Sequence, residues 1–271
     1  MTDAAKDLPL FQVDAFADRP FTGNPAAVMP LDAWLDDATL QAIAAEHNIA
    51  ETAFLIPAGD GDADYELRWF TPASEVVMCG HATLASGHVL LGRDPGLERL
   101  RFRTRQAGVL EVARDGEGYA LSLPVWRPEP QPLPEIVAAL EVDPARVVAT
   151  LRHPQRYGVV VLENEAQVRA CAPDFRRLGA AGDWLTVVTA PGDATDVVSR
   201  AFAPGAGIDE DPVTGSAHAV IVSYWAERLG RESFTAFQAS ARGGHLGCRL
   251  AGDRVILTGT CVTVIEGRMR L

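Results

Sequence analysis

The residue with the clearest chemical potential in this sequence is Glu51, which lies in the segment HNIAETAFLIP. Apolar neighbours such as Ile49 and Phe54 surround it at the expected start of a strand. An apolar environment raises the pKa of a carboxyl group toward the range in which it exchanges protons near neutral pH. We therefore expect Glu51 to be a general acid and base, against the plainer alternative of a solvated glutamate at a strand end.

Two glycine-rich segments, CGHATLASGHVLLG and TGSAHAVIVSYWAERLG, each open an apolar helix. The first turn of a helix exposes unpaired N–H groups and a positive dipole end, which together bind anions. Glycine at this place lets a ligand approach the backbone closely. Gly80 and Gly215 thus predict two places that bind a substrate carboxylate, although each glycine alone would more often only permit a tight turn into a core helix.

Polar residues beside these glycines supply the other candidates. His81 is suited to donate a hydrogen bond to a developing enolate. The alternative is that His81 only caps the helix. Asp211 and Ser216 flank the second helix start as further candidates for acid–base chemistry, while the same two residues also suit a turn and a cap. Thr214 takes the place of Cys79 after a shift of 135 positions. Because matched thiols are absent, racemisation by two thiols is disfavoured.

The composition removes several cofactor classes. Lys6 is the only lysine, in an N-terminal tail expected to be mobile, so Schiff-base and pyridoxal chemistry lack their nucleophile. The lysine-dependent phosphate loop is absent, and no G-x-G-x-x-G segment links a strand to a helix. We expect an enzyme without a cofactor.

Metal-dependent and hydrolytic chemistry also lack support. Cys79, His81 and His88 show no recognised zinc spacing, so no metal site is expected. A Ser-His-Asp triad would have to be built from His218 and neighbours only a few residues away, and no nucleophile elbow is present. Proton transfer at carbon is the chemistry that remains.

The charge and hydropathy of the chain narrow its partners and location. It has 271 residues, is 48% hydrophobic and carries a formal net charge of −12, which would repel a nucleic-acid backbone. No apolar run approaches the roughly 18 residues of a membrane span, and no signal peptide is evident. The four cysteines show no C-x-x-C spacing, so we expect free thiols in a cytoplasmic protein without nucleic-acid or membrane partners.

An internal duplication organises the sequence. Similar residues recur 135 positions apart: Gly80 and Gly215, Phe102 and Phe237, Gly108 and Gly243, Leu40 and Phe175, and Ile43 and Leu178. A repeat of this kind indicates two similar halves. If a pseudo-twofold axis relates the halves, both helix starts face one cleft between them, where ligand sites are common.

Each half has the same expected order of elements. Strands are expected at residues 11–16 and 156–162, and a helix is expected at 35–46 with Asp32 as its N-cap. A further helix follows each of Gly80 and Gly215. Both of these helices are apolar on all sides, so we expect them to be buried. The prediction is an α+β fold of two pseudo-repeated domains, residues 8–125 and 130–271, each a barrel-like mixed sheet around a central buried helix. Residues 124–134, rich in proline, form the linker, and the last strand is free to pair back with the first domain.

Five segments of the sequence carry a family resemblance: FQVDAFADRPFTGNPAAV, NIAETAFL, LRWFTPASEVVMCGHATLASGHVL, EDPVTGSAHAVIVSYWAERLG and QASARGGHLGCRL. With these segments, which span residues 11 to about 250, the chain resembles the phenazine-biosynthesis isomerase-like (PhzF-like) family within the diaminopimelate epimerase-like fold. The resemblance implies a homodimer and a cofactor-independent isomerase that moves a proton between carbons of a small, cyclic or amino-acid-like carboxylic acid.

The resemblance also implies roles for individual residues. Glu51 of the N-x-x-E-T motif is the proton shuttle, with His81 and Asp211 as catalytic partners. The substrate-binding residues are Asn24, Cys79, Gly80, Thr214, Gly215 and Ser216. Cys79 stands where epimerases of this fold carry a catalytic cysteine, so an epimerase or dehydratase using Cys79 stays open as an alternative, as does an inactive carboxylate-binding protein.

Overall fold

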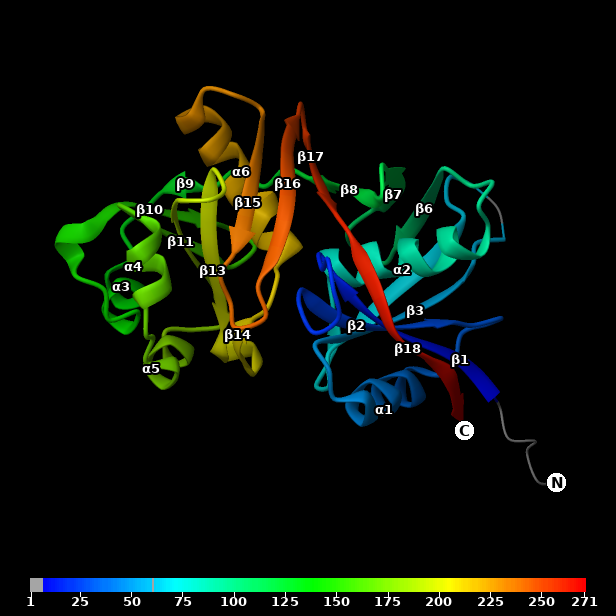
Figure 1. Ribbon diagram of the computed structural model, residues 1–271. Helices are drawn as coiled ribbons and strands as arrows, with labels where there is room; N and C mark the ends of the chain where they lie inside the picture. The colour runs from blue at the N-terminus through cyan, green and yellow to red at the C-terminus, as the bar shows by residue number, and fades with distance from the viewer. Residues whose placement is uncertain (1–6, 60) are drawn as a thin grey trace. The chain divides into compact units, whose positions relative to one another are not determined.

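The structure, a computed structural model, describes residues 7–59 and 61–271 and divides the chain into two compact units (Figure 1). Lys6 lies outside the described residues. The first unit holds the chain up to Ser122 together with Thr258–Leu271, and the second holds Leu123–Leu257. The end of the chain thus returns to the first unit, where β18 (Cys261–Arg270) pairs antiparallel with β1 (Asp7–Ala15).

A mixed sheet forms the first unit. Besides β1 and β18, its strands are β2 (Asn24–Pro30), β3 (Glu51–Pro57), β4 (Tyr65–Phe70), β5 (Glu75–Val76), β6 (Arg99–Thr104), β7 (Val109–Asp115) and β8 (Gly118–Pro124). The pairs β2–β3 and β4–β6 are parallel, and the pairs β1–β2, β3–β4, β4–β5, β6–β7 and β7–β8 are antiparallel. Parallel neighbours need a crossover connection. Helices α1 (Asp37–His47) and α2 (Gly80–Arg93) supply the two crossovers.

The sheet of the first unit is built around α2. This helix contacts β1, β2, β3, β6, β7 and β18, which include strands from both ends of the row, so the sheet curves around it (Figure 1). Its residues from Gly80 to Gly87 are all buried, as the apolar sequence predicts. A Cβ atom on Gly87 would lie only 2.4 Å from Val112 Cγ1 of β7. The missing side chain therefore lets the helix approach the sheet closely.

Helix α1 covers the other side of the sheet, where Leu40 and Ile43 pack with Phe54. The predicted N-cap of this helix, Asp32, is wrong. The helix begins later, and Asp36 caps it because its carboxylate accepts a hydrogen bond of 2.9 Å from the N–H of Thr39.

The second unit repeats this arrangement around α6 (Gly215–Leu229), which is buried along most of its length and contacts β11 and β16. Its strands are β9 (Glu129–Pro130), β10 (Val147–His153), β11 (Tyr157–Leu162), β12 (Leu185–Pro191), β13 (Val197–Ala203), β14 (Ile208–Asp211), β15 (Ser233–Gln238), β16 (Gly244–Ala251) and β17 (Arg254–Gly259). Its other helices are α3 (Pro134–Ala139), α4 (Glu165–Ala170) and α5 (Phe175–Ala180), with short 3₁₀ turns at Pro144–Arg146 and Pro204–Ala206. The proline-rich stretch expected to be a plain linker contains β9, which pairs with β10.

The two units share one order of strand pairings. The successive strand pairs from β1 to β7 are antiparallel, parallel, antiparallel, parallel and antiparallel. The successive pairs from β10 to β16 have the same order. In both units a short strand, β5 or β14, precedes the central helix. The structure is thus a mixed α/β fold with mixed sheets, in which the second half repeats the topology of the first.

One ion pair also occurs in both units. Arg68 on β4 donates two hydrogen bonds of 2.8 Å to the carboxylate of Glu75, and Arg200 on β13 donates two of 2.7 and 2.9 Å to Glu210. Each guanidinium also lies over the ring of the phenylalanine two residues further along its strand. Two-pronged pairing of this kind is geometrically specific. Each acidic residue stands five positions before the glycine that begins the central helix, so we call the two pairs the hairpin clamps.

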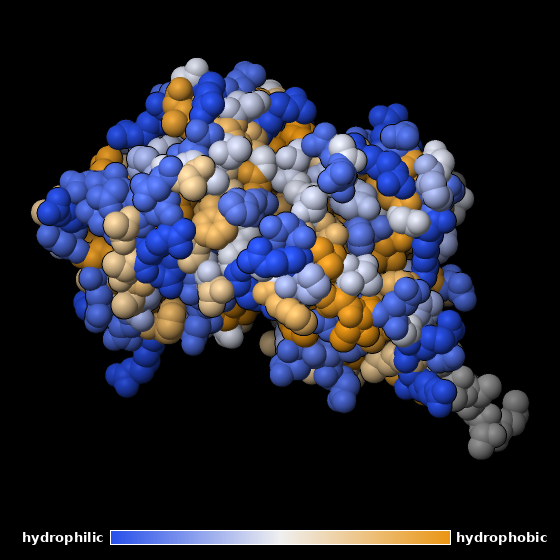
Figure 2. Space-filling model, viewed as in Figure 1, coloured by the Kyte–Doolittle hydropathy of each residue, from blue (hydrophilic) through white to orange (hydrophobic). Residues whose placement is uncertain are grey.

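The surface carries few exposed large hydrophobic side chains; those among the described residues are Phe21, Val77, Leu97, Val148, Ile265 and Leu271. Figure 2 shows a largely hydrophilic face with apolar residues interspersed. No helix in the described part of the chain combines the length and apolar character needed to cross a bilayer.

Candidate active site

The start of α2, at Gly80, brings five of the predicted site residues together within the first unit. Strands β2 and β3 run parallel with Ala26 opposite Glu51, so Asn24 and Glu51 lie at the same end of two neighbouring strands. The short strand β5 then leads to Cys79 and His81 at the N-terminus of α2. Strand pairing and one helix start therefore join residues that are far apart in the sequence.

Three short distances define this cluster. His81 Nε2 lies 3.1 Å from Glu51 Oε2, whereas His81 Nδ1 lies 3.1 Å from Asn24 Nδ2 and 3.5 Å from Cys79 Sγ. The imidazole thus stands with the carboxylate at one ring nitrogen and the amide and thiol at the other. The side chains of His81 and Glu51 are only 4% and 12% exposed, so bulk water is largely excluded from their contact.

Glu51 and His81 approach each other without forming a hydrogen bond. The two side chains form an ion pair at 3.1 Å, and neither Glu51 Oε2 nor His81 Nε2 has a hydrogen-bond partner among the described residues. Buried polar atoms are nearly always hydrogen-bonded in folded proteins, so an exception within a group of titratable side chains points to a ligand. Both atoms are therefore available to a bound molecule.

Asn24 can hold the imidazole in either charge state. When its Nδ2 donates to His81 Nδ1, the neutral ring carries its proton on Nε2 and faces Glu51 as a donor. Turned by half a rotation, the same amide offers Oδ1 as acceptor for the Nδ1–H of a protonated ring. A histidine that gives and takes up a proton needs a neighbour of this kind.

The charges of the cluster favour a protonated imidazole beside a neutral thiol. Burial lowers the pKa of His81, but Cys79 and Glu51 raise it, and the resulting pKa is well above its ordinary value of 6.5. Burial, together with the charge of Glu51, raises the pKa of Cys79 to about 11. Because such a thiol is uncharged at neutral pH, we attribute the imidazolium to Glu51. The site then holds a proton acceptor and a proton donor side by side.

The backbone at the start of α2 adds anion-binding capacity. Cys79 occupies the N-cap position but makes no side-chain capping bond, and no acidic residue lies in the first turn. The N–H groups of this turn therefore lack the side-chain acceptor that usually satisfies them. They suit a carboxylate bound next to His81.

The remaining predicted residues lie at the start of α6, in the second unit. The hydroxyl of Thr214 donates a short hydrogen bond to the carboxylate of Asp211. Gln238 donates to Thr214 Oγ1 at 3.1 Å and to the carbonyl of Asp211 at 2.7 Å, and accepts from the N–H of Thr214 at 2.8 Å. The hydroxyl of Thr214 is thus held by hydrogen bonds both as donor and as acceptor. Its counterpart in the repeat is the thiol of Cys79.

Gln238 is a site residue that the sequence analysis missed. It is completely buried at the end of β15 and makes all three of these bonds. The residue 135 positions earlier is Arg103, so the repeat gives no signal for it. No sequence pattern marks Gln238, and only its complete burial beside Thr214 in the structure identifies it.

Two further side chains lie at the start of α6. Ser216 is buried, and its hydroxyl makes no hydrogen bond with a described residue. His218 donates from Nδ1 to the carbonyl of Thr214 at 2.8 Å, and burial lowers the pKa of His218 to about 4. This histidine is therefore neutral and bound to the backbone, which agrees with the rejection of a Ser-His-Asp triad.

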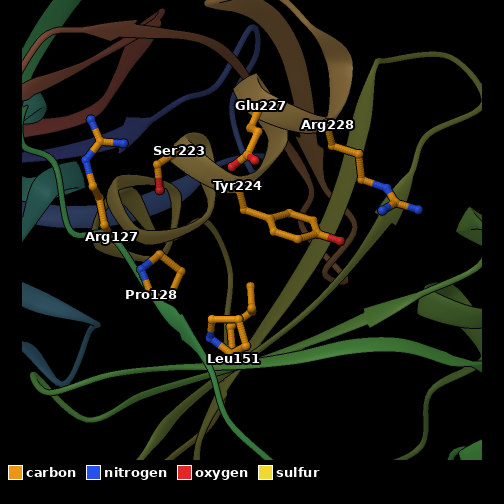
Figure 3. Close-up of a pocket in the computed structure, with 8 residues that line it drawn as sticks. Arg127, Pro128, Leu151, Ser223, Tyr224, Glu227 and Arg228 are labelled. Atoms are coloured by element: carbon orange, nitrogen blue, oxygen red, sulfur yellow. The ribbon is translucent and has the colours of Figure 1, made fainter.

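A cavity of about 560 Å³ lies elsewhere in the second unit (Figure 3). It is lined by Arg127, Pro128, Pro130, Leu151, Ser223, Tyr224, Glu227 and Arg228. Its volume suits a small ligand. None of the predicted site residues, all of which are described, lines this cavity, so it is distinct from the cluster at the start of α6.

The residues at the start of α2 also form a set of metal ligands. Glu51, Cys79 and His81 each offer one ligand atom within 4.8 Å of the others, and no second group of three such residues is found in residues 7–59 and 61–271. His88, which the sequence placed near them, instead contacts Tyr119 Oη at 3.1 Å and Thr263 Oγ1 at 2.9 Å. The set combines residues too distant in sequence for a spacing motif to reveal.

Fold and site together define a mixed α/β protein with a buried carboxylate–imidazole pair at the N-terminus of a central helix. Residues 13–267 match the model of the phenazine biosynthesis-like protein family, PhzC-PhzF. The chain belongs to this family, which confirms the resemblance recognised in the sequence.

Curated relatives match over nearly their full length. Two proteins of Pseudomonas aeruginosa, both named uncharacterized isomerases, are 48% and 49% identical over 267 residues, covering 98% and 97% of this chain and 100% and 99% of their own. The human phenazine biosynthesis-like domain-containing protein is 39% identical and covers 97% of this chain and 99% of its own. The family therefore extends from bacteria to humans with its length preserved.

Solved structures show the same fold. A PhzF family protein of Enterococcus faecalis matches with a TM-score of 0.89 at 41% identity, covering 98% of this chain and all of its own. A hydroxyproline epimerase of Agrobacterium vitis, solved with bound trans-4-hydroxy-L-proline, matches with a TM-score of 0.66 at 15% identity, covering 98% of this chain and 93% of its own. At that identity the second likeness shows the fold alone.

Proposed function

We propose that this chain is a cofactor-independent isomerase that moves a proton between carbons of a small carboxylic acid, with Glu51 as the general acid and base. The observation that carries the proposal is the buried Glu51–His81 pair, whose facing atoms are 3.1 Å apart and have no hydrogen-bond partner among the described residues. The names of the two Pseudomonas aeruginosa relatives, both isomerases, support it.

The proposed reaction uses Glu51 to move the proton and His81 to stabilise the charge that develops. The Glu51 carboxylate removes a proton from a carbon that the substrate's carbonyl or carboxyl group makes acidic, and the electron pair moves toward that oxygen. The Nε2–H of His81 donates a hydrogen bond to the oxygen as negative charge develops there. Glu51 then returns its proton to a different carbon, so that atoms and charge balance without a second reactant.

A small carboxylate is the substrate class that the site favours. The uncapped first turn of α2 offers backbone N–H groups to an anion beside His81. The structural neighbour with bound trans-4-hydroxy-L-proline, a cyclic amino acid, adds support at the level of fold. Asp211, Thr214, Gly215 and Ser216 belong to the second unit, and their predicted contacts with the substrate stay a prediction.

A second candidate is an epimerase that uses Cys79 as a base. The 3.5 Å contact of its sulfur with His81 Nδ1 favours this reading, because an adjacent imidazole can accept the thiol proton. The pKa of Cys79, raised to about 11, opposes it. The absence of a thiol at Thr214, whose hydroxyl is already bonded to Asp211, opposes it as well.

The deciding experiment measures carbon–hydrogen exchange. The protein is incubated in deuterium oxide with a panel of small carboxylic acids that includes L-proline and trans-4-hydroxy-L-proline, and deuterium at carbon is followed by NMR and mass spectrometry. Loss of the general base in Glu51→Gln should slow exchange by a factor of about 10² to 10⁴. Glu46→Gln, an exposed carboxylate on α1, is the matched control and should exchange at the wild-type rate.

Three results would contradict the proposal. Exchange at the wild-type rate in Glu51→Gln would remove Glu51 from the reaction. Loss of exchange in Cys79→Ser, with exchange intact in Glu51→Gln, would favour the epimerase. Binding of an acid by calorimetry with no exchange in any bound acid would identify a carboxylate-binding protein.

A further inference from the structure

We propose that the start of α2 is also an inhibitory Zn²⁺ site, formed by Glu51, Cys79 and His81. Binding of the metal follows from the geometry of these three side chains. Only its consequence, the inhibition of proton transfer, rests on the proposed function. The two parts can therefore be tested separately.

The chemistry of the three donors matches zinc. A carboxylate oxygen, a thiolate sulfur and an imidazole nitrogen are the three common protein ligands of Zn²⁺. Magnesium and calcium prefer oxygen ligands throughout, so sulfur and nitrogen donors disfavour them. Three protein ligands leave the fourth tetrahedral position open for water or for a substrate oxygen, as in catalytic zinc sites.

The distances fit a single ion with small side-chain movements. Two atoms bound to one tetrahedral zinc ion at about 2.0–2.1 Å lie about 3.3 Å apart. Glu51 Oε2 and His81 Nε2 are already 3.1 Å apart, and neither is engaged by a hydrogen bond with the described residues. A sulfur ligand at about 2.3 Å would lie about 3.5 Å from the imidazole nitrogen. The ligand atoms of the three residues lie within 4.8 Å of one another. The sulfur of Cys79 is 3.5 Å from His81 Nδ1, so its side chain has to turn toward Nε2 to complete the ligand set.

Asn24 supports the proposed metal site by orienting His81, without binding the ion itself. A zinc-bound histidine usually donates its other ring N–H to an oxygen atom, which fixes the orientation of the ring. The Asn24 amide lies 3.1 Å from His81 Nδ1 and, with its oxygen turned to the ring, accepts that proton. The same amide that supports both charge states of His81 therefore also supports a metal on Nε2.

Binding of zinc blocks both catalytic groups at once. The ion takes the place of the proton on Cys79 Sγ and of the proton on His81 Nε2, and both protons pass to solvent. The Glu51 carboxylate then binds the metal and is no longer a base for carbon. The Glu51 side chain is 12% exposed, so one of the three ligands reaches the solvent from which the ion comes.

Cobalt tests the binding independently of any activity. Full-length protein freed of metal with a chelator is titrated with Co²⁺, which replaces Zn²⁺ and reports its ligands by absorption. We expect one equivalent to give the sulfur-to-cobalt charge-transfer band with the strong visible bands of four-coordinate cobalt, and Zn²⁺ to abolish both. Cys79→Ser should lose the charge-transfer band, whereas Cys171→Ser, a matched change of another buried cysteine, should keep it.

Other outcomes overturn the site. No charge-transfer band in the wild type, or an unchanged band in Cys79→Ser, would exclude Cys79 as ligand. Glu51→Gln retains the thiol of Cys79, so this variant tests the metal site if Cys79→Ser does not fold. It should bind cobalt at least about 10-fold more weakly, by analogy with losses of outer-shell partners, and equal affinity would overturn the assignment of Glu51.

Inhibition is measured in the exchange assay. Addition of Zn²⁺ should stop deuterium incorporation, and a chelator should restore it. Cobalt binding through Cys79 with exchange unaffected by Zn²⁺ would overturn the inhibition and leave the metal site standing. If no acid is exchanged at all, the proposed isomerase fails, while the cobalt spectrum still decides whether the metal site exists.

Discussion

Replacement of His218 by asparagine should make the stability of the protein less sensitive to acid. His218 is completely buried in α6, donates from Nδ1 to the carbonyl of Thr214, and has a pKa that burial lowers from 6.5 to about 4. The amide of asparagine can make the same donation but does not take up a proton. The variant thus removes the titration and keeps the donor.

The sign and size of the effect follow from proton linkage. Between pH 6.5 and about pH 4 the unfolded chain binds a proton at His218 and the folded chain does not. The folded state is therefore fully stabilised above pH 6.5 and loses this contribution as the pH falls to about 4. At 1.36 kcal/mol for each pKa unit, the loss amounts to about 3 kcal/mol.

Urea unfolding followed by tryptophan fluorescence at about pH 7 and about pH 4.5 measures the effect. The wild type should lose about 2–3 kcal/mol more unfolding free energy between these two conditions than His218→Asn does. His245→Asn, at an exposed position on β16, is the control and should follow the wild type. Equal acid sensitivity of the wild type and His218→Asn would refute the reasoning, even if the variant is less stable at neutral pH.

Two further changes test the packing around the central helices by urea unfolding. Gly87→Ala places a Cβ atom 2.4 Å from Val112 Cγ1 and should lower the free energy of unfolding by about 1–3 kcal/mol. In the control Gly92→Ala, in the same helix, the new Cβ atom meets nothing within 4 Å, so the change should be neutral or stabilising by up to about 1 kcal/mol. Equal effects of the two changes would contradict the close contact with β7. Gln238→Leu removes three buried hydrogen bonds, two to Thr214 and one to the carbonyl of Asp211, so we expect a loss of about 3 kcal/mol or more. Gln41→Leu removes a single half-buried bond and should cost about 1 kcal/mol, and a loss as large as that of Gln238→Leu would count against the buried network.

Much of the topology could be predicted from local patterns. The helices after Gly80 and Gly215 are apolar on every side, and this alone predicts that each is buried within its own half. The offset of 135 positions predicted that the halves repeat each other, and their strand pairings follow the same order. The N-cap of α1 was predicted wrongly because Asp32 and Asp36 are equally suitable by type, and only the bond to Thr39 distinguishes them.

The details of the site depend on contacts that no local pattern contains. Glu51, Cys79 and His81 were recognised one at a time, but their distances depend on the register of β2 with β3 and on the path of β5. Gln238 was missed because it has no counterpart at the offset of the repeat. The hairpin clamps were missed as well, since an arginine and a glutamate several residues apart look like ordinary surface charges until the fold buries them.

The hairpin clamps separate what the two halves share from what differs between them. The same two-pronged pair, with its glutamate five positions before the central helix, stands in both halves. The residues just beyond it differ: they are Cys79 and His81 in one half and Thr214 and Ser216 in the other. The support of each helix start is thus the same in both halves, and the chemical groups that it positions are different. An engineer who wishes to give this scaffold a new activity should vary these helix-start positions and leave both clamps untouched.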